Sequence, residues 1–264
     1  MIKPKKSLGQ NFLIDNNILN KIIKTADINN NDIIEIGPGT GNLTKKIIEQ
    51  KPKSLILIEK DHKLTNYLRH DLKKHRNCKI FNDDILKFDL ENNIKKNSII
   101  IGNLPYNISS QILVKLIKFQ KWLPKYKKLI LMFQKEVAEK ILGKYNTSKY
   151  GRLAILTAAR LKITDYFNVS PNSFYPVPKV KSSVLVFEPF INKNFQVKNI
   201  ENLEKISHIF FSRKRKMINK AFIKLFKKPI YVAEKINIKL NLRPNELSEN
   251  EYFKITETFE KKIK

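Results

Sequence analysis

Short aliphatic runs alternate with amphipathic segments along the first two thirds of the chain. Such runs are typical of buried strands, and apolar residues spaced three or four positions apart indicate helices. The predicted strands are residues 32–36, 54–58, 78–81, 98–101, 129–133 and 182–187, and the predicted helices are residues 42–50, 60–74, 109–119 and 134–142. Strands that alternate with helices predict an α/β fold with a doubly wound, Rossmann-like parallel sheet. We expect the last strand to join the edge of this sheet in antiparallel orientation.

The pattern changes after Pro189. From Ile200 onward no strand pattern is present, and apolar residues such as Ile218, Phe222 and Phe226 recur at helical spacing. The sequence therefore predicts two domains, a Rossmann-like domain over residues 1–189 and a small all-helical domain over residues 190–264.

Basic residues outnumber acidic ones. The 264 residues include 52 Lys and Arg against 24 Asp and Glu, which gives a net charge of +28. A nucleotide bias of the genome explains the preference for Lys over Arg, but it does not explain this excess. The excess favours a polyanionic partner, of which nucleic acid is the commonest. Basic runs that either contact phosphates or form a solvated face lie at residues 3–6, 121–128, 213–216 and 224–228.

The composition disfavours several classes of protein. No apolar run approaches the roughly 18 residues of a membrane span, and the N-terminus lacks the apolar core of a secretory signal. The single cysteine, Cys78, excludes an intrachain disulfide and fits a reducing compartment. The four histidines have no ligand spacing with Cys78, so we predict no structural metal. We expect a cytoplasmic protein.

A glycine-rich turn follows the first predicted strand. EIGPGTGNLT, residues 35–44, places Gly37, Gly39 and Gly41 beyond the carboxyl end of a strand, where ligands bind in open α/β sheets. Glycines allow a ligand to approach the backbone closely. Position 42 is Asn, so the dinucleotide fingerprint G-x-G-x-x-G fails at its third glycine and an NAD oxidoreductase is disfavoured. The alternative is a tight turn that binds nothing.

Acidic residues follow at the ends of the next two strands. Glu59 ends the second strand, where a carboxylate can accept hydrogen bonds from both hydroxyls of a ribose, although it could equally pair with Lys60. Asp84 follows the third strand and could accept a hydrogen bond from an adenine amino group. The order of turn, Glu59 and Asp84 on successive strands predicts an adenosine-bearing ligand across the edge of the sheet.

The turn and the two acids resemble the S-adenosylmethionine-dependent methyltransferases of Rossmann-like fold. That cofactor carries a sulfonium and an ammonium group, which carboxylates and carbonyls suit, whereas a phosphate would favour a lysine. The turn offers Glu35 and no lysine before Lys45. The resemblance implies S-adenosylmethionine as cofactor, with Gly37, Glu59 and Asp84 in its binding site.

GNLPYN, residues 102–107, ends the fourth strand and is similar to the Asn-(Pro or Leu)-Pro-aromatic motif of methyltransferases that act on exocyclic amines of bases. The amine of adenine is a poor nucleophile because its lone pair is delocalised. The Asn103 amide oxygen, which would also border the cofactor, and the Leu104 carbonyl could accept hydrogen bonds from this amine and stabilise its developing charge. Pro105 would stiffen the turn, and Tyr106 would offer a flat face to the flipped-out base. A plain strand-to-helix turn is the alternative.

Three further segments resemble the rRNA adenine dimethyltransferases: KSLGQNFL at residues 6–13, YGRLAILTAA at 150–159 and NSFYPVPKVKSS at 172–183. The resemblance implies that Asn11 and Leu13 border the cofactor and that Phe174 forms a second aromatic wall for the base. A hydrophobic plug is the alternative interpretation of Phe174. Lys181 departs from the family pattern, in which Asp is usual.

FFSRKRKMINKAF, residues 210–222, resembles the basic helix in the C-terminal domain of the family's bacterial small-subunit members. We predict a helix over residues 212–226 that binds RNA through Arg213, Lys214, Arg215, Lys216 and Lys220. The resemblance implies dimethylation of the N6 of two adjacent adenosines near the 3′ end of 16S rRNA, late in assembly, with the immature small subunit as partner. We expect a monomer by default. The rivals are a large-subunit rRNA methyltransferase of macrolide resistance and a non-catalytic assembly factor.

Overall fold

The structure, a computed structural model, describes residues 4–5 and 9–262 of the chain. The chain folds into two compact units. Unit 1 comprises Met1–Ala138 and Lys162–Pro189, and unit 2 comprises Glu139–Leu161 and Phe190–Lys264. The predicted border between residues 189 and 190 is also a border between the units, whereas residues 139–161, which the sequence pattern assigned to the first domain, belong to unit 2.

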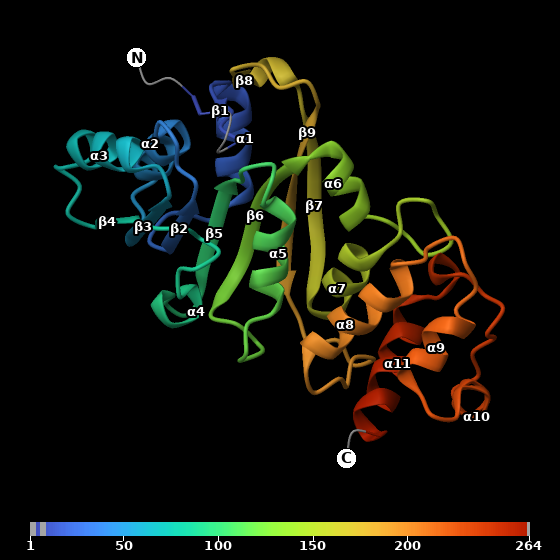
Figure 1. The fold of residues 1–264 in the computed structure, drawn as a ribbon. Helices are drawn as coiled ribbons and strands as arrows, with labels where there is room; N and C mark the ends of the chain where they lie inside the picture. The colour runs from blue at the N-terminus through green and yellow to red at the C-terminus, as the bar shows by residue number, and fades with distance from the viewer. Residues whose placement is uncertain (1–3, 6–8, 263–264) are drawn as a thin grey trace. The chain divides into compact units, whose positions relative to one another are not determined.

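Unit 1 is built on a seven-stranded sheet in the described part of the chain, with the order β4-β3-β2-β5-β6-β9-β7 (Figure 1). Its strands are β2 (Asp32–Ile36), β3 (Ser54–Glu59), β4 (Cys78–Asn82), β5 (Ser98–Asn103), β6 (Tyr126–Gln134), β7 (Leu161–Val169) and β9 (Ser182–Pro189). The pairings from β4 through to β6 are parallel, and β9 pairs with β6 in antiparallel orientation. All six predicted strands are present, and the predicted α/β class is confirmed.

Helices bury both faces of the inner parallel strands, which explains why β2, β3, β5 and β6 contain aliphatic runs, whereas no residue of the edge strand β4 is buried. The helices of this unit are α1 (Asn16–Thr25), α2 (Asn42–Glu49), α3 (His62–Asp71), α4 (Leu90–Asn93) and α5 (Ser109–Ile117), and α6 (Lys135–Ile141) follows β6. One apolar cluster joins Leu19 of α1, Ile47 of α2 and Leu68 of α3 to Ile33 and Ile99 of the sheet. Because parallel strands end at the same edge, this packing brings the carboxyl ends of β2, β3 and β5 together.

The expected place of β9 at the edge of the sheet is wrong, because β7 lies outside it. The sequence pattern predicted no strand at β7. Its sequence, LKITDYFNV, is polar, and among its nine residues only Leu161, Phe167 and Val169 are buried. An edge strand needs little apolar surface, so its hydrophobic signal is weak.

A two-stranded ribbon lies apart from the main sheet. It consists of β1 (Phe12–Leu13) and β8 (Phe174–Tyr175), which pair in antiparallel orientation. Phe12 is opposite Tyr175, and Leu13 is opposite Phe174. The ribbon joins the N-terminal segment to the loop that precedes β9.

The regular structure of unit 2 is helical in its described residues, apart from Leu161, which begins β7, and turns join the helices, as predicted for the C-terminal segment. Its helices are α7 (Arg152–Arg160), α8 (Ile200–Phe211), α9 (Asn219–Leu225), α10 (Pro229–Lys235) and α11 (Glu249–Lys262). Aromatic rings fill its core: the Phe210 ring lies 5.9 Å from that of Phe222 and 5.4 Å from that of Tyr252 between centroids. Such edge-to-face contacts stabilise a small helical core.

The predicted continuous helix over residues 212–226 is wrong. Helix α8 ends at Phe211, a turn follows, and α9 begins at Asn219. The turn is held by Ile218, whose side chain is buried and whose N–H donates a hydrogen bond to the Leu242 carbonyl at 2.9 Å. Most of the basic cluster therefore lies in a turn. In the described chain, none of the helices combines the length and the apolar character that crossing a bilayer requires.

Candidate active site

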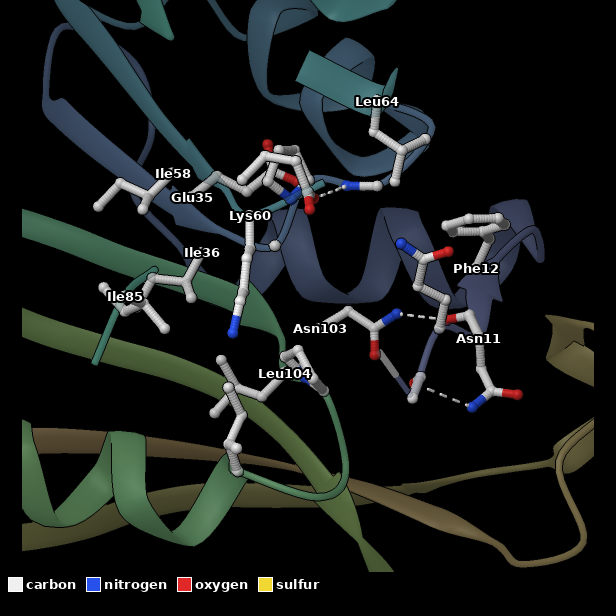
Figure 2. A pocket seen from close by; sticks show the side chains of 18 of the residues that line it. Asn11, Phe12, Glu35, Ile36, Ile58, Lys60, Leu64, Ile85, Asn103 and Leu104 are labelled. Atoms are coloured by element: carbon white, nitrogen blue, oxygen red, sulfur yellow. Dashed lines mark hydrogen bonds between the residues drawn. The ribbon is translucent and has the colours of Figure 1, made fainter. Parts of the chain in front are cut away.

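The carboxyl ends of β2, β3 and β5 open into a cavity of about 190 Å³ (Figure 2). Most of the predicted cofactor and acceptor residues line it, namely Asn11, Leu13, Gly37, Glu59, Asp84, Asn103, Leu104, Pro105 and Tyr106. These residues come from five separate segments of unit 1. The fold therefore brings together the motifs that the sequence analysis singled out separately.

The glycine turn forms one wall of the cavity. Gly37, Gly39 and Gly41 have φ angles of 68°, 59° and 82°, a region that residues with a side chain rarely adopt. A Cβ atom added to Gly39 would lie 2.9 Å from the Phe12 ring, so this ring packs directly on the turn. The turn is tight, and it also exposes its backbone to the cavity.

Glu35 lies at the base of this turn with 1% of its surface exposed. Its carboxyl group accepts a hydrogen bond from the Thr44 hydroxyl at 2.6 Å. Burial, together with the smaller effect of the negative charge of Glu59, raises the pKa of Glu35 to about 8, while the hydrogen bond from Thr44 opposes the rise. Glu35 is therefore largely protonated at neutral pH unless a cation is bound nearby.

Glu59 is held by the main chain. One carboxylate oxygen accepts the Gly39 N–H at 3.2 Å, and the other accepts the Asp61 N–H at 2.8 Å. Burial raises the pKa of Glu59, and these hydrogen bonds oppose the rise. Lys60, the alternative partner of Glu59, instead forms an ion pair with Asp84. A carboxylate oxygen has more than one lone-pair site, so Glu59 can accept further hydrogen bonds from a ligand.

Asp84 is oriented by two donors. Lys60 Nζ lies 2.9 Å from one of its oxygens, and the Leu86 N–H donates to the other at 2.9 Å. The hydrogen bond from Lys60, followed by that from Leu86, lowers the pKa of Asp84 below its ordinary value. Asp84 therefore stays ionised at neutral pH and can act only as an acceptor.

The acceptor motif begins at the last residue of β5. The Asn103 side-chain nitrogen donates to the Asn11 carbonyl at 2.9 Å, and the Asn103 oxygen points away from Asn11 (Figure 2). Further along the motif, the Tyr106 hydroxyl shares a hydrogen bond of 2.7 Å with the Ser182 hydroxyl. Burial raises the pKa of Tyr106. Both side chains therefore have a defined orientation at the cavity wall.

The N-terminal segment is fastened at the mouth of the cavity by a residue that the sequence analysis missed. Asp61 accepts hydrogen bonds from Lys5 Nζ at 3.0 Å and from Gln10 Nε2 at 3.2 Å. Asp61 also caps α3 and donates its N–H to Glu59. An Asp just before a helix signals a cap, but nothing in the sequence signals its distant partners. Residues 6–8 of the N-terminal motif lie outside the described residues.

Phe174 is not among the residues that line the cavity, and its expected role as a second aromatic wall stays a prediction. Only 1% of its surface is exposed, and its ring packs in the apolar core of unit 1 with Leu13, its partner in the β1–β8 ribbon. This position agrees with the alternative interpretation, a hydrophobic plug. The reason is strand alternation: Phe174 occupies the inner face of the ribbon, and adjacent residues of a strand point to opposite faces.

The five predicted RNA-binding residues lie in unit 2 and differ in their surroundings. Arg213, Arg215, Lys216 and Lys220 are exposed. Lys214 is half-buried, and its Nζ donates to the carbonyls of Ser148 at 2.6 Å and Tyr150 at 3.1 Å. Lys214 therefore joins its own turn to the segment of residues 148–150 within unit 2. Across the described residues, no group of three His, Cys, Asp or Glu side chains is placed to hold a metal ion.

The sheet order, the glycine turn and the two strand-end acids define a methyltransferase of Rossmann-like fold. The model of the family described as ribosomal RNA adenine dimethylase matches residues 1–261, and the chain belongs to this family. A relative from Pelagibacter ubique, named ribosomal RNA small subunit methyltransferase A, is 47% identical over 98% of both chains. A relative of the same name from a Wolbachia strain of Drosophila simulans is 38% identical over 94% of this chain and 90% of its own.

Solved structures agree with this assignment. A dimethyladenosine transferase from Plasmodium falciparum has a TM-score of 0.79 and 30% identity over 95% of this chain and 98% of its own. The 23S rRNA methyltransferase ErmE, at a TM-score of 0.67 and 21% identity over 95% of this chain and all of its own, shares the fold. The protein is therefore an S-adenosylmethionine-dependent rRNA adenine dimethyltransferase. The acidic side chains of Glu35, Glu59 and Asp84, which line the cavity beside the glycine turn, fit an adenosine-bearing cofactor that carries positive charge.

Proposed function

We propose that this protein dimethylates the N6 atoms of two adjacent adenosines near the 3′ end of 16S rRNA, late in small-subunit biogenesis, as a cytoplasmic monomer. The observation that carries the proposal is the Asn103–Asn11 hydrogen bond, which leaves the Asn103 oxygen as an acceptor at the cavity wall. The similarity to relatives named for the small subunit and the net charge of +28 support an rRNA substrate in that subunit.

In this proposal the cofactor is held by residues around the sheet edge. Glu59 accepts hydrogen bonds from the ribose hydroxyls, and Asp84 accepts one from the adenine amino group. Gly37, Asn11, Leu13 and Asn103 border the rest of the cofactor. The bound cofactor supplies an electrophilic methyl group.

The acceptor amine is activated by fixed polar groups. The Asn103 oxygen and the Leu104 carbonyl accept hydrogen bonds from the adenine amine, drawing its lone pair out of conjugation and stabilising the positive charge that develops on nitrogen. Pro105 restricts the backbone that carries the Leu104 carbonyl. The ring of Tyr106, anchored by its hydrogen bond with Ser182, provides a face for the base. The methylated amine is acidic and loses its proton to water, so no strong general base is required.

The exposed basic residues of unit 2 bind phosphates. Arg213, Arg215, Lys216 and Lys220 contribute to this binding, whereas Lys214 has a structural role. Phosphate contacts position RNA without reading its sequence, so the shape of the immature subunit selects the target. In this proposal the domain of residues 1–189 binds the cofactor and performs the methyl transfer, and the domain of residues 190–264 binds RNA.

The test is incubation of the protein with labelled S-adenosylmethionine and either undermethylated small subunits or large subunits, followed by mapping of the label. We expect label on the N6 of two adjacent adenosines near the 3′ end of 16S rRNA. Label on large-subunit RNA would instead support a large-subunit rRNA methyltransferase of macrolide resistance. The absence of label on both substrates would contradict the proposal.

A further inference from the structure

A loop next to the cavity exposes an unusual set of side chains. We name residues 175–181 the rim loop; its sequence is YPVPKVK. Both of its ends are fastened to residues that line the cavity. At its start, Tyr175 pairs with Phe12 in the β1–β8 ribbon. Just after its end, Ser182 shares the 2.7 Å hydrogen bond with Tyr106. The rim loop therefore lies beside the cavity without lining it, with one end tied to Phe12 next to the glycine turn and the other to Tyr106 of the acceptor motif.

Main-chain hydrogen bonds anchor the chain at both ends of the rim loop. The Lys135 N–H donates to the Lys181 carbonyl at 2.9 Å, and the Ile14 N–H donates to the Ser173 carbonyl, just before the loop, at 2.9 Å. Pro176 and Pro178 restrict the backbone between these anchors. A loop fixed in this way loses little conformational freedom when a ligand binds to it.

The rim loop presents apolar and basic groups to solvent together. Tyr175, Val177 and Val180 are 53%, 59% and 44% exposed. Lys179 and Lys181 are exposed between and beside them. Single exposed apolar residues are ordinary, but a cluster on one anchored loop indicates a binding surface. The two lysines indicate an anionic partner.

The register of the ribbon decides which aromatic ring is available. Residues directly opposite in an antiparallel pair extend to the same face, so Tyr175 lies on the face of Phe12, whose ring packs on the glycine turn. Phe174 lies on the other face, in the core. Tyr175 is therefore the aromatic side chain that this segment offers to solvent beside the cavity.

We propose that Tyr175, with Lys179 and Lys181, forms a stacking surface for an unpaired RNA base that neighbours the target adenosine. The inference rests on the proposed function, because an RNA strand must enter the cavity for a neighbouring base to reach the loop. An aromatic face combined with cationic side chains is how proteins bind single-stranded nucleic acid, and stacking tolerates any base. The same lysines would attract the phosphates on either side of that base.

The test compares three variants of the full-length protein: Tyr175→Ala, Tyr175→Phe and Tyr166→Ala. Tyr166, on β7 of the same unit, is 56% exposed and serves as the matched control. The measurements are the KM for undermethylated small subunits, the Kd for a short unpaired RNA oligonucleotide and the Kd for S-adenosylmethionine. We expect Tyr175→Ala to raise KM and the RNA Kd on the order of tenfold. Tyr175→Phe and Tyr166→Ala should stay near the wild-type values, and no variant should change the cofactor Kd.

Several outcomes would overturn this surface. Equal effects of Tyr175→Ala and Tyr166→Ala would do so, as would a matching loss of cofactor affinity, which would indicate a structural role. Weaker binding to whole subunits with unchanged binding to protein-free RNA would indicate a protein partner instead. If the wild type methylates small subunits and Tyr175→Ala binds RNA normally, the stacking surface is contradicted and the proposed function is not. If the wild type does not methylate small subunits but Tyr175→Ala still weakens oligonucleotide binding, the stacking surface is supported and the proposed function is contradicted.

Discussion

The side-chain nitrogen of Asn103 donates a hydrogen bond to the main-chain carbonyl of Asn11, 92 residues earlier in the sequence, at 2.9 Å. The bond ties the end of β5 to the N-terminal segment. It also selects one of the two orientations of the amide, because the nitrogen is used and the oxygen is directed elsewhere. A residue that must accept a hydrogen bond from a substrate amine is thereby oriented before the substrate arrives.

Asn103→Ala should lower kcat by about 10²–10³-fold, by analogy with the removal of one preorganised polar group. The affinity for RNA should change little, because phosphate contacts elsewhere supply it. Single-turnover methylation measured beside RNA binding checks both parts. Near-normal turnover in this variant would remove the proposed role of the amide.

Glu59→Gln should weaken S-adenosylmethionine binding on the order of tenfold or more. The NH₂ group of the new amide would face the N–H of either Gly39 or Asp61, and that buried N–H would lose its acceptor. Calorimetric titration of the cofactor measures this. Glu49→Gln, which alters an exposed ion pair with Lys46, is the control and should bind the cofactor normally.

Lys115 is a positioning residue for the loop that carries Asp84. Its Nζ donates to the carbonyls of Ile85, Leu86 and Phe88 at 2.8, 3.0 and 2.6 Å, and Ile85 and Leu86 line the cavity. Lys115→Met should raise the cofactor Kd on the order of tenfold, because three carbonyls lose their donor. Lys87→Met removes the same charge from the exposed surface of this loop, so an equal effect there would show that charge alone is responsible.

Glu35 should make stability depend on pH. Its folded-state pKa of about 8 lies above the ordinary value of 4.5, so the folded state binds the proton more tightly. The resulting stabilisation is present below about pH 4.5 and is lost as the pH rises toward about 8. The free energy of unfolding should fall by about a few kcal/mol over this range. Without cofactor, the wild type should therefore lose stability relative to Glu35→Gln between pH 5 and 9 in thermal unfolding. A constant difference across this range would contradict the assignment.

The basic residues of unit 2 should separate into two groups. Replacing Arg213 and Lys216 by Ala should weaken RNA binding and reduce the slope of log affinity against log salt by about 2, because two phosphate contacts are lost. Lys214→Ala should lower the melting temperature instead, because the hydrogen bonds to the Ser148 and Tyr150 carbonyls are lost. If Lys214→Ala reduced the salt slope more than the replacement of Arg213 and Lys216 does, the two assigned roles would be reversed.

The parallel strands and the turns that follow them could be predicted from the sequence. Most residues of strands β2, β3, β5 and β6 are buried, and these strands therefore consist of aliphatic runs, whereas the glycine turn needs residues that tolerate positive φ. The edge strand β7 could not be predicted, because polar residues separate its apolar ones and leave no apolar run. The break between α8 and α9 was also missed, since it depends on the contact of Ile218 with Leu242 and not on local helix propensity.

By itself, the sequence determined the α/β class, the glycine turn and the positions of Glu59 and Asp84 beside strand ends, because strand periodicity and glycine conformation are local properties of the chain. The tertiary structure decided which way the Asn103 amide points, that Asp61 holds the N-terminal segment, and that Tyr175 and not Phe174 faces solvent. These features depend on hydrogen-bond partners and strand register between distant segments. No local pattern encodes such partners, because the folded core is what brings them within reach.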